Sequence, residues 1–438
     1  MKNLNIPLFD LVMSITNTVD LISPTLVDHH KRVAYLSYCF AEELGLSREE
    51  RNDIFLAAAL HDIGGLTLKE RIDALEFELK DSDHSINGFL LLSKHQPFAK
   101  AAEIIRHHHC WWEKSRENQE IPLGSYIVHL ADRIAVLINP QKDILNQMDR
   151  IYQTISQQKG KMFMPDLVHL FQDLLPKVYI WLEAASHYTV PILKDKVNLG
   201  DFTISIDELL SVTKVFSHLI DFRSAFTARH SSGVASAAES LAQLSSFSIV
   251  EQKMMRVAGF LHDIGKLAVP GEILEKPGQL TKDEFNIIKT HTFYTYRTLF
   301  PIKELNVINN WASLHHEKLD GSGYPFNLNE DSLSLGSRIM AVADVFTALT
   351  EDRPYRKGMP KSQVINILKK MVDNMALDKN VVDLLLINYE EINRRTLLAQ
   401  EVAVSEYKLF LQKCYSMKSD SNLENANFLP CKLIEKGL

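Results

Sequence analysis

Most of the chain has the hydrophobic pattern of helices, with apolar residues three and four positions apart. In the segment after Thr281, for example, Phe285, Ile288 and Leu299 fall on one side of a helix. Alternating runs rich in Val and Thr, which are typical of strands, are few. We therefore predict an all-α fold for both halves of the chain.

Several helix starts are marked by capping boxes, in which a Ser or Thr is followed three residues later by Glu. Such pairs begin at Ser47, Ser248 and Thr281. The first two lie 14 residues before a His-Asp pair, which begins at His61 in one case and at His262 in the other. Two separate helices are therefore predicted to lead into the same motif.

The two His-Asp pairs belong to a long repeat. Residues 57–64 read Ala-Ala-Ala-Leu-His-Asp-Ile-Gly, and residues 257–265 read Val-Ala-Gly-Phe-Leu-His-Asp-Ile-Gly. A further histidine stands 32 residues before each pair, and the triplet Leu-Gly-Ser recurs at 123–125 and 335–337. We therefore predict two tandem copies of one helical domain.

The junction between the copies is predicted around residues 190–202, where Pro191 and Gly200 flank charged residues. The first domain is predicted over residues 1–195 and the second over residues 203–415. Residues 416–438 have no clear periodicity and are predicted to form a C-terminal tail.

Composition restricts the class of protein. The 438 residues are 46% hydrophobic and 24% charged, which is typical of globular chains and long for a single core. A net charge of −7 without a basic run argues against DNA or RNA polymers as partners. Four cysteines without metal-finger spacing, and no long apolar run, predict a cytoplasmic protein without a membrane span. The unusual number is the 17 histidines.

Histidines and aspartates of the second half form a set suited to transition metals, which favour imidazole and carboxylate ligands. Seven such side chains exceed what one ion binds, so we predict two ions bridged by Asp263. Within a helix, the adjacent His262 and Asp263 would point about 100° apart, and Lys266 would lie on the same face to neutralise an anionic substrate. The predicted ligands are His230, His262, Asp263, His291, His315, His316 and Asp344.

The segment from His315 to Pro325 has two glycines and a proline around one tyrosine, which favours a tight loop. Because this loop begins at two predicted ligands, it is expected to lie over the metals. Arg353 and Arg356 follow Asp344 by nine and twelve residues and could bind phosphates through their guanidinium groups. A solvated helix end is an equal alternative for these two arginines.

Three segments together resemble the HD-GYP phosphodiesterases, a subgroup of the HD metallohydrolase superfamily. They are the His-Asp-Ile-Gly-Lys string at 262–266, the loop at 315–325, and the segment 344–356. The resemblance covers roughly residues 205–400 and implies an all-helical domain with two or three metals. Iron and manganese are the usual ions, with nickel, cobalt and magnesium as further candidates. Members with three metals have a glutamate where this chain has Phe226, so we expect two metals.

Carried over by position, the resemblance implies that the seven predicted ligands hold the metals. Asp263 would bridge them and would be catalytic together with Lys266. Substrate contacts are implied for Lys266, Tyr324, Arg353 and Arg356.

The predicted function is hydrolysis of a 3′-5′ cyclic dinucleotide to the linear 5′-phosphorylated dinucleotide in bacterial second-messenger signalling. Cyclic di-GMP and 3′,3′-cyclic GMP-AMP (3′,3′-cGAMP) are both kept as substrates. The alternative is a receptor or signalling scaffold that binds the cyclic dinucleotide without cleaving it, against which the complete ligand set and Lys266 argue. A mononucleotide phosphohydrolase is a further alternative, against which the tyrosine loop argues. A homodimer is left open.

The first copy resembles a plain HD domain, and Gly65 stands there in place of Lys266. The tyrosine loop is replaced by residues 110–114, so we expect catalysis in the second domain. The first is expected to modulate the second; a sensor for another ligand and a second hydrolase are alternatives. With His107 counted in the first set, the six remaining histidines are expected to have no functional role. The first copy retains a second metal-binding set, with an ambiguity of one residue around His107: His29, His61, Asp62, His84, His108, His109 and Asp132.

Overall fold

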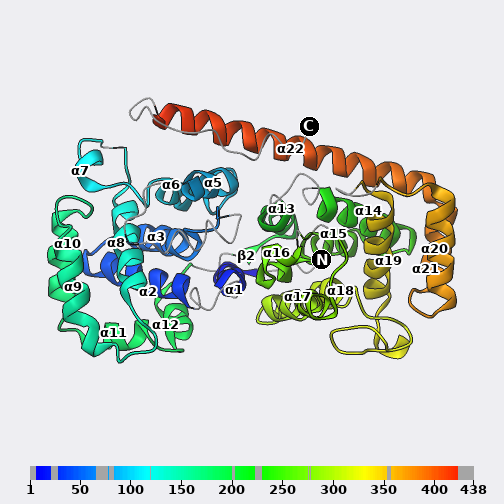
Figure 1. Ribbon diagram of the computed structural model, residues 1–438, viewed down its shortest axis with the longest axis horizontal. Helices are drawn as coiled ribbons and strands as arrows, with labels where there is room; N and C mark the ends of the chain where they lie inside the picture. The colour runs from blue at the N-terminus through cyan, green and yellow to red at the C-terminus, as the bar shows by residue number, and fades with distance from the viewer. Residues whose placement is uncertain are drawn as a thin grey trace. The chain divides into compact units, whose positions relative to one another are not determined.

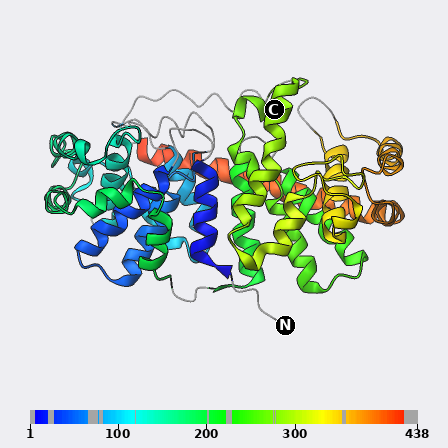
Figure 2. The same cartoon turned by 90° about the horizontal axis from the view of Figure 1, so that it is seen from below.

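The computed structural model describes residues 6–20, 28–65, 77, 83–118, 120–199, 203–221, 229–274, 276, 278–352 and 357–422. These residues form two compact units, a first unit up to Ile204 and a second unit from Ser205 onward. Each unit is a bundle of helices (Figure 1; Figure 2). The strands among the described residues are β1 (Ile6–Pro7) and β2 (Thr203–Ile204), which pair antiparallel. The predicted all-α fold is confirmed.

The first unit contains α1 (Leu8–Asp20), α2 (His29–Glu43), α3 (Arg48–Leu60), α5 (Asp83–Leu92), α6 (Ala99–Arg106), α7 (Trp112–Ser115), α8 (Leu123–Leu137), the 3-10 helix η1 (Leu145–Gln147), α9 (Met148–Ser156), α10 (Pro165–Leu174), α11 (Val178–Ala184) and α12 (Thr189–Lys196). The helices α2 and α8 are buried along most of their length. Because α3 packs against both of them, these three helices form the core of the unit (Figure 1).

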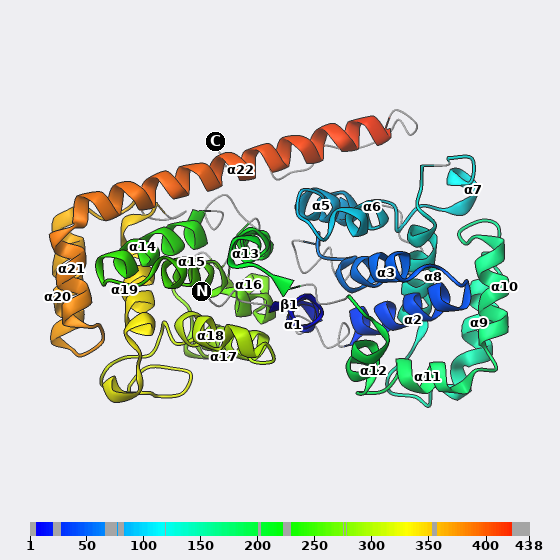
Figure 3. The same ribbon diagram turned by 180° about the vertical axis from the view of Figure 1, so that it is seen from behind.

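The second unit contains α13 (Ile206–Asp221), α14 (His230–Leu244), α15 (Ile249–Leu261), the 3-10 helix η3 (Ile264–Ala268), α16 (Gly271–Leu274), α17 (Lys282–Leu299), η4 (Lys303–Leu305), α18 (Asn306–Ser313), η5 (Glu330–Ser332), α19 (Leu335–Thr350), α20 (Lys361–Asp373), α21 (Lys379–Ile387) and α22 (Tyr389–Asn422). Its core forms where α14 packs against α15, α19 and α22. Figure 3 shows α22 running past α14.

The predicted capping boxes are confirmed at the starts of α3, α15 and α17. In each, the hydroxyl of the first residue accepts a hydrogen bond from the backbone N–H of the glutamate, and the glutamate side chain accepts one in return. The starting residues are Ser47, Ser248 and Thr281. Two of these helices, α3 and α15, end directly before a His-Asp pair. The boxes therefore fix the helices that present the motif.

A glycine in each His-Asp-Ile-Gly motif lets a neighbouring helix approach closely. A Cβ atom at Gly265 would lie 1.9 Å from the backbone oxygen of His291 on α17, and one at Gly64 would lie 2.1 Å from that of His84 on α5. Any side chain at these positions would push the neighbouring helix away. The glycine therefore sets the position of the helix that carries the next predicted ligand.

The last helix, α22, continues to Asn422 and so extends into the segment 416–438 predicted as a tail. The predicted domain bounds of 1–195 and 203–415 stay predictions. Among the described residues, none of the helices has both the length and the apolar character that crossing a membrane requires.

Candidate metal centres

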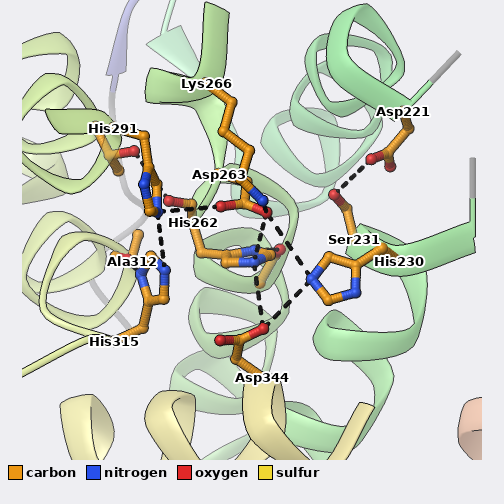
Figure 4. A network of polar contacts seen from close by, with 12 residues as sticks. Asp221, His230, Ser231, His262, Asp263, Lys266, His291, Ala312, His315 and Asp344 are labelled. Atoms are coloured by element: carbon orange, nitrogen blue, oxygen red, sulfur yellow. Dashed lines mark hydrogen bonds and ion pairs between the residues drawn. The ribbon is translucent and has the colours of Figure 1, made fainter. Parts of the chain in front are cut away.

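The predicted ligands of the second unit come from several elements and point toward one another. Figure 4 shows His230, His262, His291, His315 and Asp344 around the Asp263 carboxylate. The full predicted set is His230 at the start of α14, His262 and Asp263 between α15 and η3, His291 on α17, His315 and His316 after α18, and Asp344 on α19. Helices that are far apart in the sequence therefore contribute to one buried cluster, which we call the second-unit centre.

The helix expected across the His-Asp-Ile-Gly-Lys string is not continuous. The α-helix α15 ends at Leu261, His262 is its C-cap, and Asp263 is the N-cap of the 3-10 helix η3. The expectation that Lys266 shares an α-helical face with the pair is therefore wrong. Lys266 Nζ still lies 2.5 Å from Asp263 Oδ2, because a 3-10 helix brings residues three positions apart into line.

The two carboxylate oxygens of Asp263 face two different groups of histidines. Its Oδ2 lies 3.2 Å from His262 Nε2 and 3.8 Å from His230 Nε2. Its Oδ1 lies 3.4 Å from His291 Nε2. Asp344 joins the first group, since its Oδ1 lies 3.3 Å from His230 Nε2. His291 joins His315 and His316 in the second group.

These separations fit ligands that share an ion. Two atoms that each lie about 2.1 Å from one ion are about 3.0 to 4.2 Å apart, depending on the angle at the ion. In addition, the buried Nε2 of His262 has no hydrogen-bond partner among the described residues, which costs about 1–3 kcal/mol unless a ligand binds there. Sets of His and Asp ligand atoms within 4.8 Å of one another include the partly buried His230 with the buried His262 and Asp344. The donor set therefore suits two divalent transition metals.

Backbone carbonyls orient three of the imidazoles. The Nδ1 atoms of His262, His291 and His315 donate to carbonyls three residues earlier, over 2.8, 2.6 and 2.6 Å. A proton on Nδ1 leaves Nε2 as the atom that can bind a metal. The ends of the helices α15 and α18 thus select the tautomer that a ligand needs.

Burial keeps the second group of imidazoles neutral. It lowers the pKa of His291, His315 and His316 to about 3, so their Nε2 lone pairs are available at neutral pH. Burial would raise the pKa of Asp263, but the electrostatic interaction with His262 is the largest of the opposing causes that hold this pKa well below its usual range. Neutral imidazoles of the second group therefore lie beside an ionised Asp263 carboxylate.

Glu351, at the end of α19, is a functional candidate that the sequence analysis missed. Its buried carboxylate accepts from His230 Nδ1 over 3.1 Å. Burial would lower the pKa of His230, but Glu351 and Asp344 raise it to about 10. A carboxylate on the outer nitrogen is the usual way to orient a ligating histidine. Its place two helical turns after Asp344 is the signal that could have found it.

Tyr324 lies beside the cluster. Its ring centre is 5.0 Å from that of His316, and Lys289 Nζ lies 5.4 Å from the Tyr324 ring centre. The loop is held by the buried Glu317, whose carboxylate accepts the backbone N–H groups of residues 326 and 328 over 2.6 and 3.0 Å. An aromatic face and a cation therefore adjoin the second group of histidines.

The other predicted substrate contacts cannot be placed. Arg353 and Arg356 lie outside the described residues, as does Phe226, the position on which the expectation of two metals depends. Their roles stay as the sequence predicts them.

The first unit brings its own seven predicted residues together in the same pattern. Asp62 Oδ2 lies 3.2 Å from His61 Nε2, and Asp62 Oδ1 lies 3.3 Å from His84 Nε2. His29 Nε2 lies 3.3 Å from Asp132 Oδ1. Buried atoms within 4.8 Å of one another group as Asp62 with His84, His108 and His109, and as His29 with His61 and Asp62. We call this cluster the first-unit centre.

The one-residue ambiguity around His107 is resolved by the geometry. His84 Nε2 lies 2.9 Å from His109 Nε2 and 3.4 Å from His108 Nε2. The Nδ1 of His107 instead lies 3.7 Å from Cys110 Sγ. His108 and His109 are therefore the pair that faces His84.

The two centres differ in their cations. In the first unit, the buried Arg133 pairs with Asp132 Oδ2 over 2.5 Å. Gly65, where the second unit has Lys266, carries no cation. Because Arg133 is 1% exposed, its charge neutralises a carboxylate without reaching a substrate.

Comparison with known proteins agrees with the duplicated architecture. HD-domain family models match residues 26–137 and residues 214–381. A crystal structure of a cyclic GMP-AMP specific phosphodiesterase of Vibrio cholerae matches with a TM-score of 0.62 at 22% identity, over 88% of this chain and 98% of that one. At this identity the likeness establishes the fold.

Similarity to curated relatives identifies the family more specifically than the domain models or the fold do. The 3′3′-cGAMP-specific phosphodiesterase 1 of Vibrio cholerae is 32% identical over 400 residues, which cover 88% of this chain and 93% of the relative. The 3′3′-cGAMP-specific phosphodiesterase 3 of that organism is 27% identical over 83% of this chain and 91% of the relative. A cyclic di-GMP phosphodiesterase of Pseudomonas aeruginosa is 46% identical over 110 residues, 25% of this chain and 27% of the relative. The chain therefore belongs to the family of cyclic-dinucleotide phosphodiesterases with tandem HD domains, the second of the HD-GYP type.

Proposed function

We propose that the protein hydrolyses a 3′,3′-cyclic dinucleotide to the linear 5′-phosphorylated dinucleotide, with catalysis in the second unit. The observation that carries the proposal is the Asp263 carboxylate, whose two oxygens lie 3.2 and 3.4 Å from His262 and His291 Nε2. Such an arrangement suits a bridging carboxylate between two ions. Catalytic roles follow for Asp263 and Lys266, and Fe or Mn are the ions we propose.

Different residues of the second unit would have different roles in hydrolysis. When bound, a pair of divalent ions supplies Lewis acidity and a nucleophile derived from water near neutral pH. Asp263 would hold the ions together with the histidines that face its two oxygens, and Glu351 orients the His230 ring through Nδ1. Lys266 neutralises the charge that grows on the phosphate oxygens as the water oxygen attacks phosphorus. The 3′ oxygen then leaves and takes up a proton.

Substrate contacts are proposed for Tyr324 and, outside the described residues, for Arg353 and Arg356. The Tyr324 face beside Lys289 suits a nucleobase or ribose next to a phosphate. Lys266 Nζ lies at Asp263 Oδ2, and Tyr324 lies beside His316 of the second group, so the substrate phosphate would lie between Lys266 and the loop.

Among cyclic dinucleotides, we propose 3′,3′-cGAMP ahead of cyclic di-GMP. Two relatives that match over 83% or more of this chain are named for 3′3′-cGAMP. Relatives named for cyclic di-GMP match over 25% and 39% of this chain. The difference lies in the extent of the match, and a direct substrate comparison tests it.

The first unit is proposed to bind metal through His29, His61, Asp62, His84, His108, His109 and Asp132 and to modulate the second unit. It lacks both the lysine and the tyrosine loop, so it is not expected to cleave the cyclic dinucleotide. We further propose a cytoplasmic protein whose partner is the cyclic dinucleotide.

The test is a substrate panel. Full-length protein loaded with Fe²⁺ or Mn²⁺ is incubated with 3′,3′-cGAMP, cyclic di-GMP and cyclic di-AMP, and linear products are followed by chromatography. We expect linear product from 3′,3′-cGAMP at the highest rate. The Asp263→Asn variant is the matched control and should yield none. Binding of a cyclic dinucleotide without any linear product would contradict the proposal and indicate a receptor.

A further inference from the structure

His30 is one of the six histidines that the sequence pattern leaves outside both ligand sets, yet it lies at the first-unit centre. It is the second residue of α2, directly after His29, and is 2% exposed. The corresponding residue of the second unit is Ser231, which follows His230 in α14. The two centres therefore differ by one imidazole.

Both ring nitrogens of His30 face carboxylates. Its Nδ1 bonds to Asp20 Oδ1 at the end of α1, and its Nε2 lies 3.8 Å from Asp62 Oδ2. The ring centre is 5.3 Å from that of His29 and 5.0 Å from that of His61. His30 is thus packed among residues of the first-unit centre.

The inner nitrogen of His30 faces a carboxylate of the first-unit centre. It is buried and has no hydrogen-bond partner among the described residues, which is costly for a polar atom. Its 3.8 Å separation from Asp62 Oδ2 is too long for a hydrogen bond and falls within the roughly 3.0–4.2 Å expected for two ligands of one ion.

The outer nitrogen has the partner that ligating histidines usually have. A carboxylate that accepts from the far side of an imidazole fixes the ring and the tautomer and increases its basicity toward a metal. Asp20 provides this carboxylate. In the second unit, the matching Asp221 accepts from Ser231 Oγ over 2.9 Å, so the carboxylate is retained where the imidazole is not.

We propose that His30 is an additional metal ligand of the first-unit centre, oriented by Asp20. This rests on the proposal that the first unit binds metal. The ion would be a divalent first-row transition metal, and one more nitrogen ligand than in the second unit favours ions that prefer imidazole. The first-unit centre is therefore expected to hold its metal by a different ligand set from the catalytic one.

The experiment isolates the first-unit centre in the full-length chain. In a background with His262→Ala and Asp263→Ala, which removes the second-unit centre, Co²⁺ is titrated into metal-free protein. Affinity and the visible ligand-field spectrum of the bound Co²⁺ are measured, because the spectrum reports the number and type of ligands. Far-UV circular dichroism and thermal unfolding confirm that each variant is folded.

Two replacements of His30 separate a ligand from a structural partner. His30→Asn keeps a donor for Asp20 but has no atom at the Nε2 position, and His30→Ser introduces the residue found at the matching position of the second unit. Both should weaken Co²⁺ binding at least about 10-fold and change its spectrum. Asp20→Asn should weaken binding about 10- to 100-fold. The matched control is His107→Asn. His107 precedes the predicted ligand His108 but faces Cys110, so its replacement should leave the spectrum unchanged.

The outcomes are distinct. Unchanged affinity and spectrum in His30→Asn and His30→Ser would overturn the assignment of His30 while leaving a metal centre in the first unit. No Co²⁺ binding by the folded background protein would overturn the first-unit centre itself, and His30 with it.

Discussion

At the scale of single residues, the proposed chemistry depends most directly on Asp263 and Lys266. The ammonium group of Lys266 lies 2.5 Å from Asp263 Oδ2 and is partly exposed, so it is close to the ion sites and accessible to a substrate phosphate. The two residues have different proposed roles: Asp263 binds the ions, and Lys266 neutralises the charge that develops on the substrate phosphate. Their substitution should therefore have different consequences for metal content.

Lys266→Met is expected to lower kcat about 10²- to 10³-fold, as the loss of one charge-stabilising donor does in other active sites. Metal content should remain near that of the unaltered protein, because Lys266 is not a ligand. Steady-state kinetics and elemental analysis of the same sample check both points. Loss of metal together with activity would instead assign Lys266 a role in assembling the centre.

Asp221 gives a prediction about pH. Burial raises its pKa to about 7, above the value of about 3.9 in an unfolded chain. A raised folded-state pKa means that the folded protein binds the proton more tightly. Its contribution to stability is thus complete below about pH 4 and is lost as the pH rises through about 7.

Asp221→Asn removes this titration. In metal-free protein, the free energy of unfolding of the variant should fall less between about pH 5 and about pH 8 than that of the unaltered chain. Urea unfolding at the two pH values measures the difference. Parallel decreases in both proteins would show that Asp221 does not carry the pH dependence.

At the scale of elements, the junctions between helices position the ligands. The capping boxes of α3 and α15 fix the helices that end at the His-Asp pairs, and the motif glycines let α5 and α17 approach. These helix starts could be predicted from the sequence because capping depends on residues three positions apart. The 3-10 helix η3 could not be predicted, because α17 must first pack against the motif and accept the backbone N–H of Gly265.

Gly265→Ala tests this packing. The added Cβ would lie 1.9 Å from the His291 backbone oxygen, so α17 must move, at a cost of about 1–3 kcal/mol or more. We expect a lower melting temperature and loss of metal from the second-unit centre. Gly64→Ala is the matched variant in the first unit and should lower stability while retaining cyclic-dinucleotide hydrolysis. Full activity of Gly265→Ala would show that the approach of α17 is not needed.

At the scale of the whole molecule, the chain carries two related centres that differ in the residues around their ligand sets. The second has Lys266 and the tyrosine loop; the first has Arg133 buried on Asp132 and, at its edge, His30. Duplication followed by such divergence favours one catalytic and one modulating domain. The first-unit centre therefore serves as a matched control for the proposed active site in the second unit.

The same double substitution can be made in the His-Asp pair of each unit, and the two variants can then be compared. His262→Ala with Asp263→Ala should abolish hydrolysis of the cyclic dinucleotide, because it removes the bridging carboxylate and a ligand from the second unit. His61→Ala with Asp62→Ala should leave measurable hydrolysis, with its rate or substrate affinity altered if the first unit modulates the second. Complete loss of activity in this second variant, in a folded protein, would assign the chemistry to both units.

The sequence by itself determined the helical fold, the duplication and the residues of both candidate ligand sets. It could do so because helices impose a period of three to four, and because a ligand set has a fixed spacing of His and Asp that recurs in the two copies. The sequence could not show in which direction the other side chains point. Whether His30, Asp20 or Glu351 faces a centre depends on how α1, α2 and α19 pack, and isolated His, Asp or Glu residues are common in any sequence.

Only the tertiary structure decided that His108 and His109, rather than His107, face His84. It also brought Asp20 of α1 against His30 of α2, and the matching carboxylate of α13 against Ser231. The physical reason is that burial and contact are properties of packed helices. A spacing in the sequence can fix which residues share a helix face, but the neighbouring helices decide what that face meets.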